Sequence, residues 1–349
     1  MANGKFLMVS ECGSSTCLHS PFTVHYSLFT ILNLSMTDAP ILLEALLQSL
    51  LLEAGIKQKV DRILLLGSST NTVWKVEIGA HQYVVRHRLD DNLNVAEKEF
   101  FLSKVLHEHD VPAVEVLAIV ANHHGVATLS SWIPGISLEQ AIHDYSTMDL
   151  GRAWFSAGAI LRLSHGIEFP VAGEIVGDRV EPFESVWGQW VLEGVVDDIR
   201  WLQNKLQLFQ IDFRLLERVV SKAQVALENR PNRLVHNDAL PQNILVHPGK
   251  NGWECTGWVD WEFARSGDPM WDLATLDFRP ANLVPTAFYD GYGHHPAEPI
   301  SSIYELLMGT WRIRVELEHG ALWEWPPQKE RLRYARDLPN QIEKLASML

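Results

Sequence analysis

The sequence predicts an α+β fold with two lobes, in which a small lobe built on an antiparallel β-sheet precedes a larger, mostly helical lobe. Between residues 62 and 131, short segments rich in β-branched and aromatic residues alternate with turn residues, which is typical of antiparallel strands. Beyond Gly135 the spacing of apolar residues becomes helical. The chain has 349 residues and is 47% hydrophobic, which is enough material for two cores. We therefore divide it into residues 1–37, 38–132 and 133–349.

Residues 1–37 show neither a helical nor a strand period, so we interpret them as a poorly ordered extension in which Met36 is an alternative start. The N-terminus lacks the apolar region of a signal peptide. No apolar run reaches the roughly 18 to 20 residues that a membrane-spanning helix needs. Three cysteines in a chain of this size do not form a disulfide framework. We expect a cytoplasmic protein without a membrane segment.

The small lobe (38–132) is predicted to contain two helices and five strands. Asp38 can cap the first helix, whose leucines recur at helical spacing, and Gly55 ends it. Glycine-containing turns separate the strands that follow. The predicted helices are Pro40–Ala54 and Asn94–His109, and the predicted strands are Arg62–Leu66, Thr72–Ile78, Gln82–His87, Val114–Val120 and Gly125–Ser131.

The large lobe (133–349) is predicted to be mostly helical, with one β-hairpin. Helical spacing is found in Leu138–His143, Gly151–Ser164, Ser185–Leu208 and Phe213–Asn229. The hairpin joins Asn243–Val246 to Cys255–Val259 through a segment with Pro-Gly and Asn-Gly pairs, which are strong turn formers. The densest cluster of ionisable residues in the chain flanks this hairpin.

The formal net charge is −14 and the pI is about 5.5. Such a charge repels nucleic acid and anionic membranes, so we exclude both as non-specific partners. It would attract a small cationic substrate, although an acidic surface also serves solubility. The balance weakly favours a cationic small molecule.

The ionisable cluster contains the groups that phosphoryl transfer requires. His236, Asp238 and Asn243 have the spacing of a kinase catalytic loop. In that reaction a carboxylate orients the attacking hydroxyl and accepts its proton, a role that we assign to Asp238. Asn243 and Asp260 lie at the inner ends of the hairpin strands, so closing the turn brings an amide oxygen and a carboxylate together. Those are ligands that Mg²⁺ prefers.

These motifs resemble the aminoglycoside phosphotransferase and choline kinase group. The shared motifs are Leu234–Val246, Val259–Glu262, Gly267–Pro269 and Asp272–Ala274, within a looser likeness over Ile63–Gly293. The resemblance implies a protein-kinase-like fold with ATP between the lobes. It also implies that Asp238 is the catalytic base and that Asn243 and Asp260 are magnesium ligands.

The resemblance further implies cofactor-binding residues in the small lobe. The glycine-containing loop after the first strand, with Ser68 and Asn71, would cover the phosphates. Arg86 stands where the family has a nucleotide-contacting lysine, and Glu99 would be its partner on the second helix. An arginine can also bind phosphates, in a bidentate manner. Trp132 falls in the hinge that would contact the adenine.

Three residues around the catalytic loop receive structural roles. Asn237 stands where the family usually has glycine, and asparagine tolerates unusual backbone angles, so we expect the loop to form. We expect His236 to pack and hydrogen-bond so that it fixes the loop. Asp272 should accept backbone N–H bonds from the catalytic loop.

The acceptor is expected to be a hydroxyl of a small molecule. The chain runs from Asp260 into Gly267-Asp-Pro269 without an activation segment or an Ala-Pro-Glu element, which argues against a protein substrate. Glu262 is the candidate substrate residue. The acidic residues Glu193, Asp197, Asp198, Glu316 and Glu318 offer a site for an amine, or form an ordinary solvated surface.

The sequence leaves the acceptor class open among aminoglycosides, choline-like amines, amino-acid alcohols and sugars. A different class of function is a nucleotide-binding regulator without turnover, which the intact Asp238, Asn243 and Asp260 disfavour. A protein kinase of atypical type is a third alternative. We expect a monomer or a homodimer.

Overall fold

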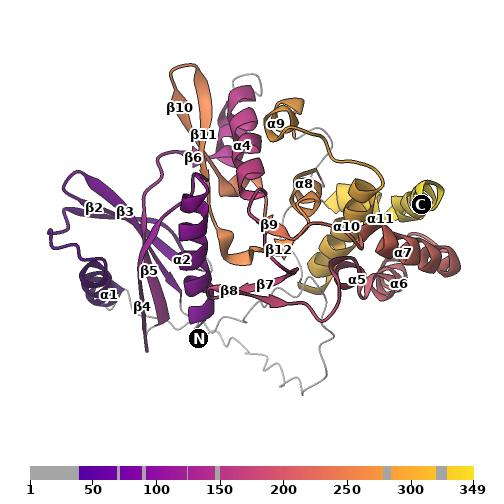
Figure 1. The fold of residues 1–349 in the computed structure, drawn as a ribbon, viewed down its shortest axis with the longest axis horizontal. Helices are drawn as coiled ribbons and strands as arrows, with labels where there is room; N and C mark the ends of the chain where they lie inside the picture. Colours follow the sequence, from indigo (N-terminus) through magenta and orange to yellow (C-terminus); the bar gives the residue numbers. More distant parts are fainter. Residues whose placement is uncertain are drawn as a thin grey trace, which may run out of the picture.

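The computed structural model describes residues 39–68, 71–88, 92–123, 125–145, 150–277, 284–319 and 328–349. In Figure 1 an antiparallel sheet with two helices forms one side of the molecule, and most of the helices gather on the other. The predicted α+β fold with a β lobe before a helical lobe is therefore confirmed. The predicted extension, residues 1–37, lies outside the described residues.

The sheet of the small lobe has five antiparallel strands in the order β1-β2-β3-β5-β4. The strands are β1 (Arg62–Ser68), β2 (Asn71–Ile78), β3 (His81–Arg88), β4 (Val116–Asn122) and β5 (Gly125–Ser131). Each lies within two residues of its predicted range. Strand β3 is central, with β2 on one side and β5 on the other. Its side chains are therefore held in register on both sides.

Two helices pack against this sheet. Helix α1 (Ala39–Glu53) buries Leu46 and Leu50 against sheet residues such as Val76 and Leu129, which form a separate core of the small lobe. Helix α2 (Leu93–Glu108) also contacts β4 and β5, but its buried Leu102 belongs to the core of the large lobe. Its apolar side chains are buried against the small lobe on one side and against the large lobe on the other, which removes them from water. Helix α2 therefore connects the two lobes.

The helices of the large lobe surround one extended core. They are α3 (Leu138–Asp144), α4 (Gly151–Ser164), α5 (Trp187–Leu192), α6 (Val195–Leu206), α7 (Phe213–Leu227), α8 (Met270–Asp277), α9 (Thr286–Tyr292), α10 (Ile300–His319) and α11 (Gln328–Met348). The range Ser185–Leu208, predicted as one helical segment, is broken at Gly194, whose φ of +76° is left-handed. Within the described ranges, no helix is both long and apolar enough to cross a bilayer.

Short strands of the large lobe position the catalytic loop. One sheet has the order β8-β7-β12-β9 and another the order β11-β10-β6. Their strands are β6 (Ile136–Ser137), β7 (Gly173–Val176), β8 (Arg179–Pro182), β9 (Arg233–Val235), β10 (Ile244–Gly249), β11 (Gly252–Trp258) and β12 (Arg265–Gly267). The hairpin β10–β11 was predicted, but β6, β7, β8, β9 and β12 were not. Strand β9 leads into the catalytic loop and β12 leads into Asp268, so their pairing places these two segments side by side.

Candidate active site

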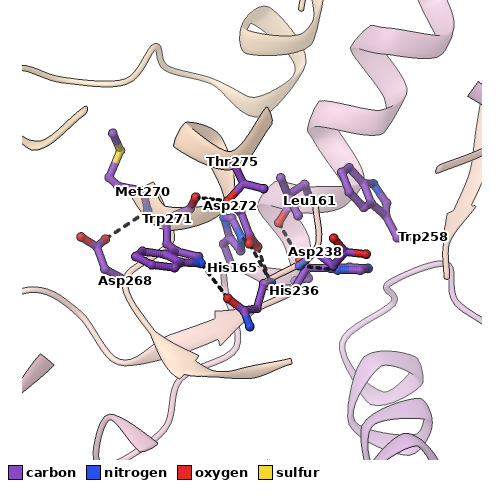
Figure 2. A network of polar contacts seen from close by, with 12 residues as sticks. Leu161, His165, His236, Asp238, Trp258, Asp268, Met270, Trp271, Asp272 and Thr275 are labelled. Atoms are coloured by element: carbon purple, nitrogen blue, oxygen red, sulfur yellow. Dashed lines mark hydrogen bonds and ion pairs between the residues drawn. The ribbon is translucent and has the colours of Figure 1, made fainter. Parts of the chain in front are cut away.

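The loop after β9 is fixed by a carboxylate from helix α8. Asp272 is fully buried, and its Oδ2 and Oδ1 accept hydrogen bonds from the backbone N–H of His236 at 2.7 Å and of Asn237 at 2.8 Å. Figure 2 shows Asp272 lying between His236 and His165, whose Nε2 is 3.0 Å from Oδ2. The expected role of Asp272 is confirmed. It satisfies backbone donors that burial would otherwise leave without partners.

His236 links the catalytic loop to the end of β11. Its Nε2 lies 3.0 Å from the carbonyl oxygen of Val259, which can only accept, so Nε2 carries a hydrogen. Its Nδ1 accepts a hydrogen bond from the backbone N–H of Asp238 at 3.3 Å, so the ring is the neutral Nε2–H tautomer. The ring is fully buried and lies 4.4 Å, centroid to centroid, from Trp261. His236 therefore orients the loop, as expected from the sequence.

Asn237 occupies the left-handed conformation that the family motif usually gives to glycine. Its φ is +64°, and its side-chain Oδ1 accepts a hydrogen bond of 2.7 Å from the indole N–H of Trp271. Asparagine visits this region at lower cost than most residues. The loop therefore forms as expected, and its side chain gains a partner that glycine lacks.

Asn243 holds the carboxylate of Asp238. The Asn243 Nδ2 atom donates to the Asp238 backbone oxygen at 2.9 Å and to its Oδ2 at 2.8 Å. Asp238 precedes the short helix η1 (Pro241–Asn243), of which Asn243 is the last residue, and this helix turns the chain from the catalytic loop into β10. This use of the amide nitrogen leaves the amide oxygen of Asn243 as an acceptor. The pair thus presents a carboxylate and an amide oxygen in a fixed arrangement.

Arg86 connects Asp260 with helix α2. Its Nη1 atom lies 2.8 Å from Glu99 Oε1 and 3.2 Å from Asp260 Oδ1. The negative charge of Glu99 is the main cause that raises the pKa of Arg86 above its ordinary value, with Asp260 adding to it. Asp260 itself follows β11 in the left-handed conformation, with φ +70°. The predicted pairing of Arg86 with Glu99 is present, and the arginine stays charged.

A cavity of about 260 Å³ lies between the lobes. Arg86, Glu99 and Asp260 contribute its charged lining. Its apolar lining comes from both lobes and includes Leu66, Val73, Val84, Val116, Leu245 and Val259. Trp132, Ile133 and Gly135 of the connection between the lobes also line it, and the contact of Trp132 with adenine stays a prediction. An apolar cleft with a few converging charged groups is the usual form of a small-molecule site.

The loop expected to cover the phosphates is placed only at its ends. Ser68 ends β1 and Asn71 begins β2, and residues 69 and 70 lie outside the described residues. Asn71 does not line the cavity between the lobes. The assignment of Ser68 and Asn71 to the nucleotide remains a prediction.

Glu262 is engaged by a partner that the sequence analysis missed. It lies in the short helix η2 (Trp261–Phe263), and its Oε2 is 2.5 Å from Nη1 of Arg88 on β3. Both side chains are less than one-fifth exposed, at 13% and 15%. Glu262 does not line the cavity. Because side chains alternate along a strand, Arg88 lies on the same face as Arg86, and this period is the signal that would have suggested it.

The acidic residues proposed for an amine are also largely paired. Asp197 lies 2.6 Å from Arg200, and Asp198 contacts Arg314. Arg314 is paired with Glu318 as well, at 3.0 Å. The side chain of Glu316 lies outside the described residues. Asp197, Asp198 and Glu318 are therefore paired with arginines, which neutralise their charge.

Among the described residues, no group of three or more histidine, cysteine or acidic side chains could hold a metal. Magnesium does not need such a group, because one or two protein oxygens, substrate phosphates and water complete its coordination. The hairpin brings the two expected ligands to adjacent chain segments, since the N–H of Val259 donates to the Asn243 carbonyl at 2.9 Å. The amide oxygen of Asn243 and the carboxylate of Asp260 thus fit a magnesium ion shared with phosphates.

A family model described as the phosphotransferase enzyme family, APH, matches residues 62–302, which is more than half of the chain. The chain belongs to this family. The match contains the candidate catalytic, metal and cofactor residues proposed from the sequence, together with Glu262, and confirms the resemblance drawn there. Curated protein sequences gave no match.

Solved structures of similar fold include aminoglycoside phosphotransferases. APH(4)-Ia has a TM-score of 0.61 at 16% identity, over 90% of this phosphotransferase and 99% of that chain. A thermostable mutant of APH(4)-Ia, in a ternary complex with ADP and hygromycin B, has a TM-score of 0.57 at 17% identity over 86% and 97%. The streptomycin–ATP–APH(2")-IIa complex has a TM-score of 0.55 at 18% identity over 91% and 99%. These likenesses confirm the kinase-like fold.

Proposed function

We propose that this phosphotransferase transfers the γ-phosphate of ATP to a hydroxyl group of a small molecule in a magnesium-dependent reaction. One observation carries the proposal. Asp238 is held by Asn243 in a loop anchored on Asp272, while Asp260 meets Arg86 and the cavity between the lobes. Phosphoryl transfer depends mainly on positioning and electrostatic stabilisation, which such a braced arrangement provides.

The cavity supports a nucleotide with its base in the apolar part and its phosphates toward Arg86. Trp132 and Gly135 of the connection line the cavity, and Gly135 has φ +147° with Val246 O only 2.6 Å from where a Cβ would lie. The backbone there approaches β10 more closely than a side chain permits. Related structures were solved with ADP and with ATP, which supports a nucleotide as the ligand by fold-level analogy.

Asn243 and Asp260 would hold magnesium through their side-chain oxygens. When bound, the metal would neutralise charge on the phosphates. Asp238 then orients the acceptor hydroxyl and takes its proton. Arg86 adds a positive charge. Its guanidinium stays protonated at any physiological pH, because Glu99 and Asp260 stabilise the charged form. Each of these groups is a described side chain with a fixed partner.

The acceptor is proposed to be a small molecule because the described residues include no activation segment between Asp260 and β12. Hygromycin B and streptomycin occupy related enzymes, so aminoglycosides are the first class to examine. A cationic acceptor gains no support from Glu262 or Asp198, which are both paired with arginines. Sugars and amino alcohols therefore belong in the same panel.

The test is coupled ADP release from Mg·ATP with a panel of aminoglycosides, choline analogues, amino alcohols and sugars. Asp238→Asn should lose about 10²- to 10⁴-fold in kcat while still binding Mg·ATP, because only proton acceptance is removed. Asp178→Asn makes the same chemical change on an exposed turn between β7 and β8 and should behave as the parent. Parent-like turnover by Asp238→Asn would contradict the proposed base. Binding of Mg·ATP without turnover on any acceptor would favour the regulatory alternative.

A further inference from the structure

We propose that the large lobe contains a second binding site, for a small phosphate-bearing anion, which is coupled to the catalytic loop. The site is a cavity of about 550 Å³ between the ends of α4 and α9 and the start of α8. It is lined by Arg162, His165, Gly166, Arg230, Pro231, Arg233, Asp268, Pro269, Met270, Tyr292, Gly293 and His294. None of these residues lines the cavity between the lobes.

Positive charge converges on this cavity from two separate segments, the end of α4 and residues 230–233 before and in β9. Arg230 donates from Nε and Nη2 to Asp268, at 2.5 and 3.0 Å, and Arg233 pairs with Glu168 at 2.5 Å. Arg162, an exposed residue at the end of α4, has a guanidinium that makes no hydrogen bond or ion pair in the described part of the chain. One cationic fork is therefore left for a ligand, in a protein whose formal net charge is −14.

A helix C-terminus gives Arg162 a second use, since a positive charge there complements the helix dipole. That effect accounts for one arginine at the end of α4. It does not explain why Arg230 and Arg233 lie around the same cavity from a different segment. Planar guanidinium groups bind phosphate oxygens in a bidentate manner, and several of them around one cavity suit a phosphate dianion.

The shape of the cavity suits a small organic phosphate. Its volume lies within the range of about 300 to 1,000 Å³ that small-molecule sites occupy. Gly293 ends α9 with φ +100°, and a Cβ at this position would lie 2.9 Å from Nη1 of Arg162. The glycine thus leaves room at the guanidinium. Pro231, Pro269 and Met270 add an apolar wall for the rest of the ligand.

One residue of the cavity lining, His165, is hydrogen-bonded to Asp272, the carboxylate that supports the catalytic loop. Two of the lining residues, His165 and Tyr292, are hydrogen-bonded to each other, with Nδ1 of His165 2.8 Å from the hydroxyl. Nε2 of the same imidazole donates to Asp272, the carboxylate that holds the N–H groups of His236 and Asn237 (Figure 2). An anion that accepts the Tyr292 hydroxyl hydrogen would compete with His165 and so act on Asp272.

Binding is tested on the full chain by titrating inorganic phosphate and, separately, glycerol phosphate at constant ionic strength, with the unfolding midpoint as readout. A ligand that binds the folded state raises this midpoint in a saturable way. Arg162→Gln should weaken binding at least tenfold. Arg152→Gln, which removes an arginine from the same helix outside the cavity, should keep the parent affinity. The two ligands distinguish a site for free phosphate from one for a phosphate monoester.

Repeating the titration on Arg86→Gln separates this cavity from the one between the lobes, so the outcome does not depend on the proposed kinase activity. The proposal is overturned if neither ligand stabilises the chain saturably, or if Arg162→Gln binds as the parent does.

Coupling is tested by hydrogen exchange of the His236 and Asn237 amides. Saturating phosphate should change their exchange rate several-fold in the parent and leave it unchanged in Arg162→Gln. Tyr292→Phe should still bind phosphate but lose this response, because the hydroxyl that joins the ligand to His165 is gone. Unchanged exchange in the parent with phosphate bound would overturn the coupling.

Discussion

Asn237 shows how one side chain adapts the catalytic loop to this chain. The backbone at this position needs a positive φ, and the side-chain oxygen replaces solvent as the acceptor for the Trp271 indole N–H. A buried indole N–H without a partner costs free energy, so the asparagine stabilises both groups. Trp271 in turn lies beside Asp272, so the two neighbours anchor consecutive parts of one loop.

Substitutions at Asn237 should separate backbone conformation from the side-chain hydrogen bond. Asn237→Gly keeps the accessible φ and loses only the bond to Trp271, so activity should stay within several-fold of the parent. Asn237→Val places a β-branched residue at φ +64°, which costs about 1–3 kcal/mol, and should lower both stability and kcat further. Urea unfolding and coupled ADP release measure the two effects. Equal losses in both variants would show that the backbone conformation is not the constraint.

The residue types that phosphoryl transfer requires are visible in the sequence, whereas ion pairs between residues distant in the chain are not. Asp238, Asn243 and Asp260 stand in one ordered motif with few intervening elements, so their proximity follows from a hairpin. The bond between Arg88 and Glu262 joins residues far apart in the chain. Strand alternation places Arg88 on the face of Arg86, but no local pattern identifies its partner. Pairs of this kind depend on how the lobes meet, which the sequence pattern does not specify.

At the scale of elements, helix α2 connects the small-lobe sheet to the segment that follows Asp260. It contacts β4 and β5 on one side and β7 and η2 on the other. Lys98 is buried, and its Nζ donates a hydrogen bond of 2.9 Å to the backbone oxygen of Ala264. Burial lowers the pKa of Lys98 from 10.5 to about 8. The neighbouring Glu99 faces Arg86, so consecutive residues of α2 reach both sides of the site.

The lowered pKa of Lys98 predicts how stability changes with pH. Because the unfolded chain binds the Lys98 proton more tightly than the folded chain, unfolding takes up a proton between pH 8 and pH 10.5. The contribution of Lys98 should therefore raise the free energy of unfolding as the pH rises through this window, by about 3 kcal/mol in all. Lys98→Met lacks this contribution. The free energy of unfolding of the parent should therefore increase relative to that of the variant as the pH rises.

Urea unfolding at pH 8 and pH 10 measures this difference, and Lys104→Met provides the control. Lys104 is exposed on the same helix, so its substitution should leave the pH dependence of stability as in the parent. Groups elsewhere titrate equally in all three proteins and cancel in the comparison. A parallel pH dependence in parent and Lys98→Met would contradict the lowered pKa.

Helices and strands were predictable where the segment is long enough to show its periodicity. The strands of the small lobe run for seven or eight residues with turns between them, and their predicted ranges agree closely with β1 to β5. Strands β9 and β12 have three residues each, too few to show alternation. Gly194 breaks a range predicted as helical because its left-handed φ separates α5 from α6. Short strands and local breaks are decided by packing.

At the scale of the whole molecule, two ion pairs join the lobes beside the cavity. Arg86 and Arg88 of β3 meet Asp260 and Glu262 of the large lobe. The shielded pair of Arg88 with Glu262 should couple the stability of the lobes. A double-mutant cycle with Arg88→Gln and Glu262→Gln should give a coupling free energy of about 0.5–3 kcal/mol in urea unfolding. Additive effects, together with a rise in acceptor KM for Glu262→Gln alone, would instead support its assignment to the substrate.

Asp260 is the residue through which nucleotide binding should act on both lobes at once. It belongs to the large lobe, contacts Arg86 of the small lobe and is proposed to hold magnesium. In the parent, Mg·ADP at 100 times its Kd should stabilise the fold by about 2.7 kcal/mol, and removing magnesium with EDTA should remove much of that gain. Asp260→Ala should bind ADP equally weakly with and without magnesium. Asp178→Ala, on an exposed turn, should keep the magnesium response. If Asp260→Ala still responds to magnesium as the parent does, the metal lies elsewhere and the hairpin ends serve only to join the lobes.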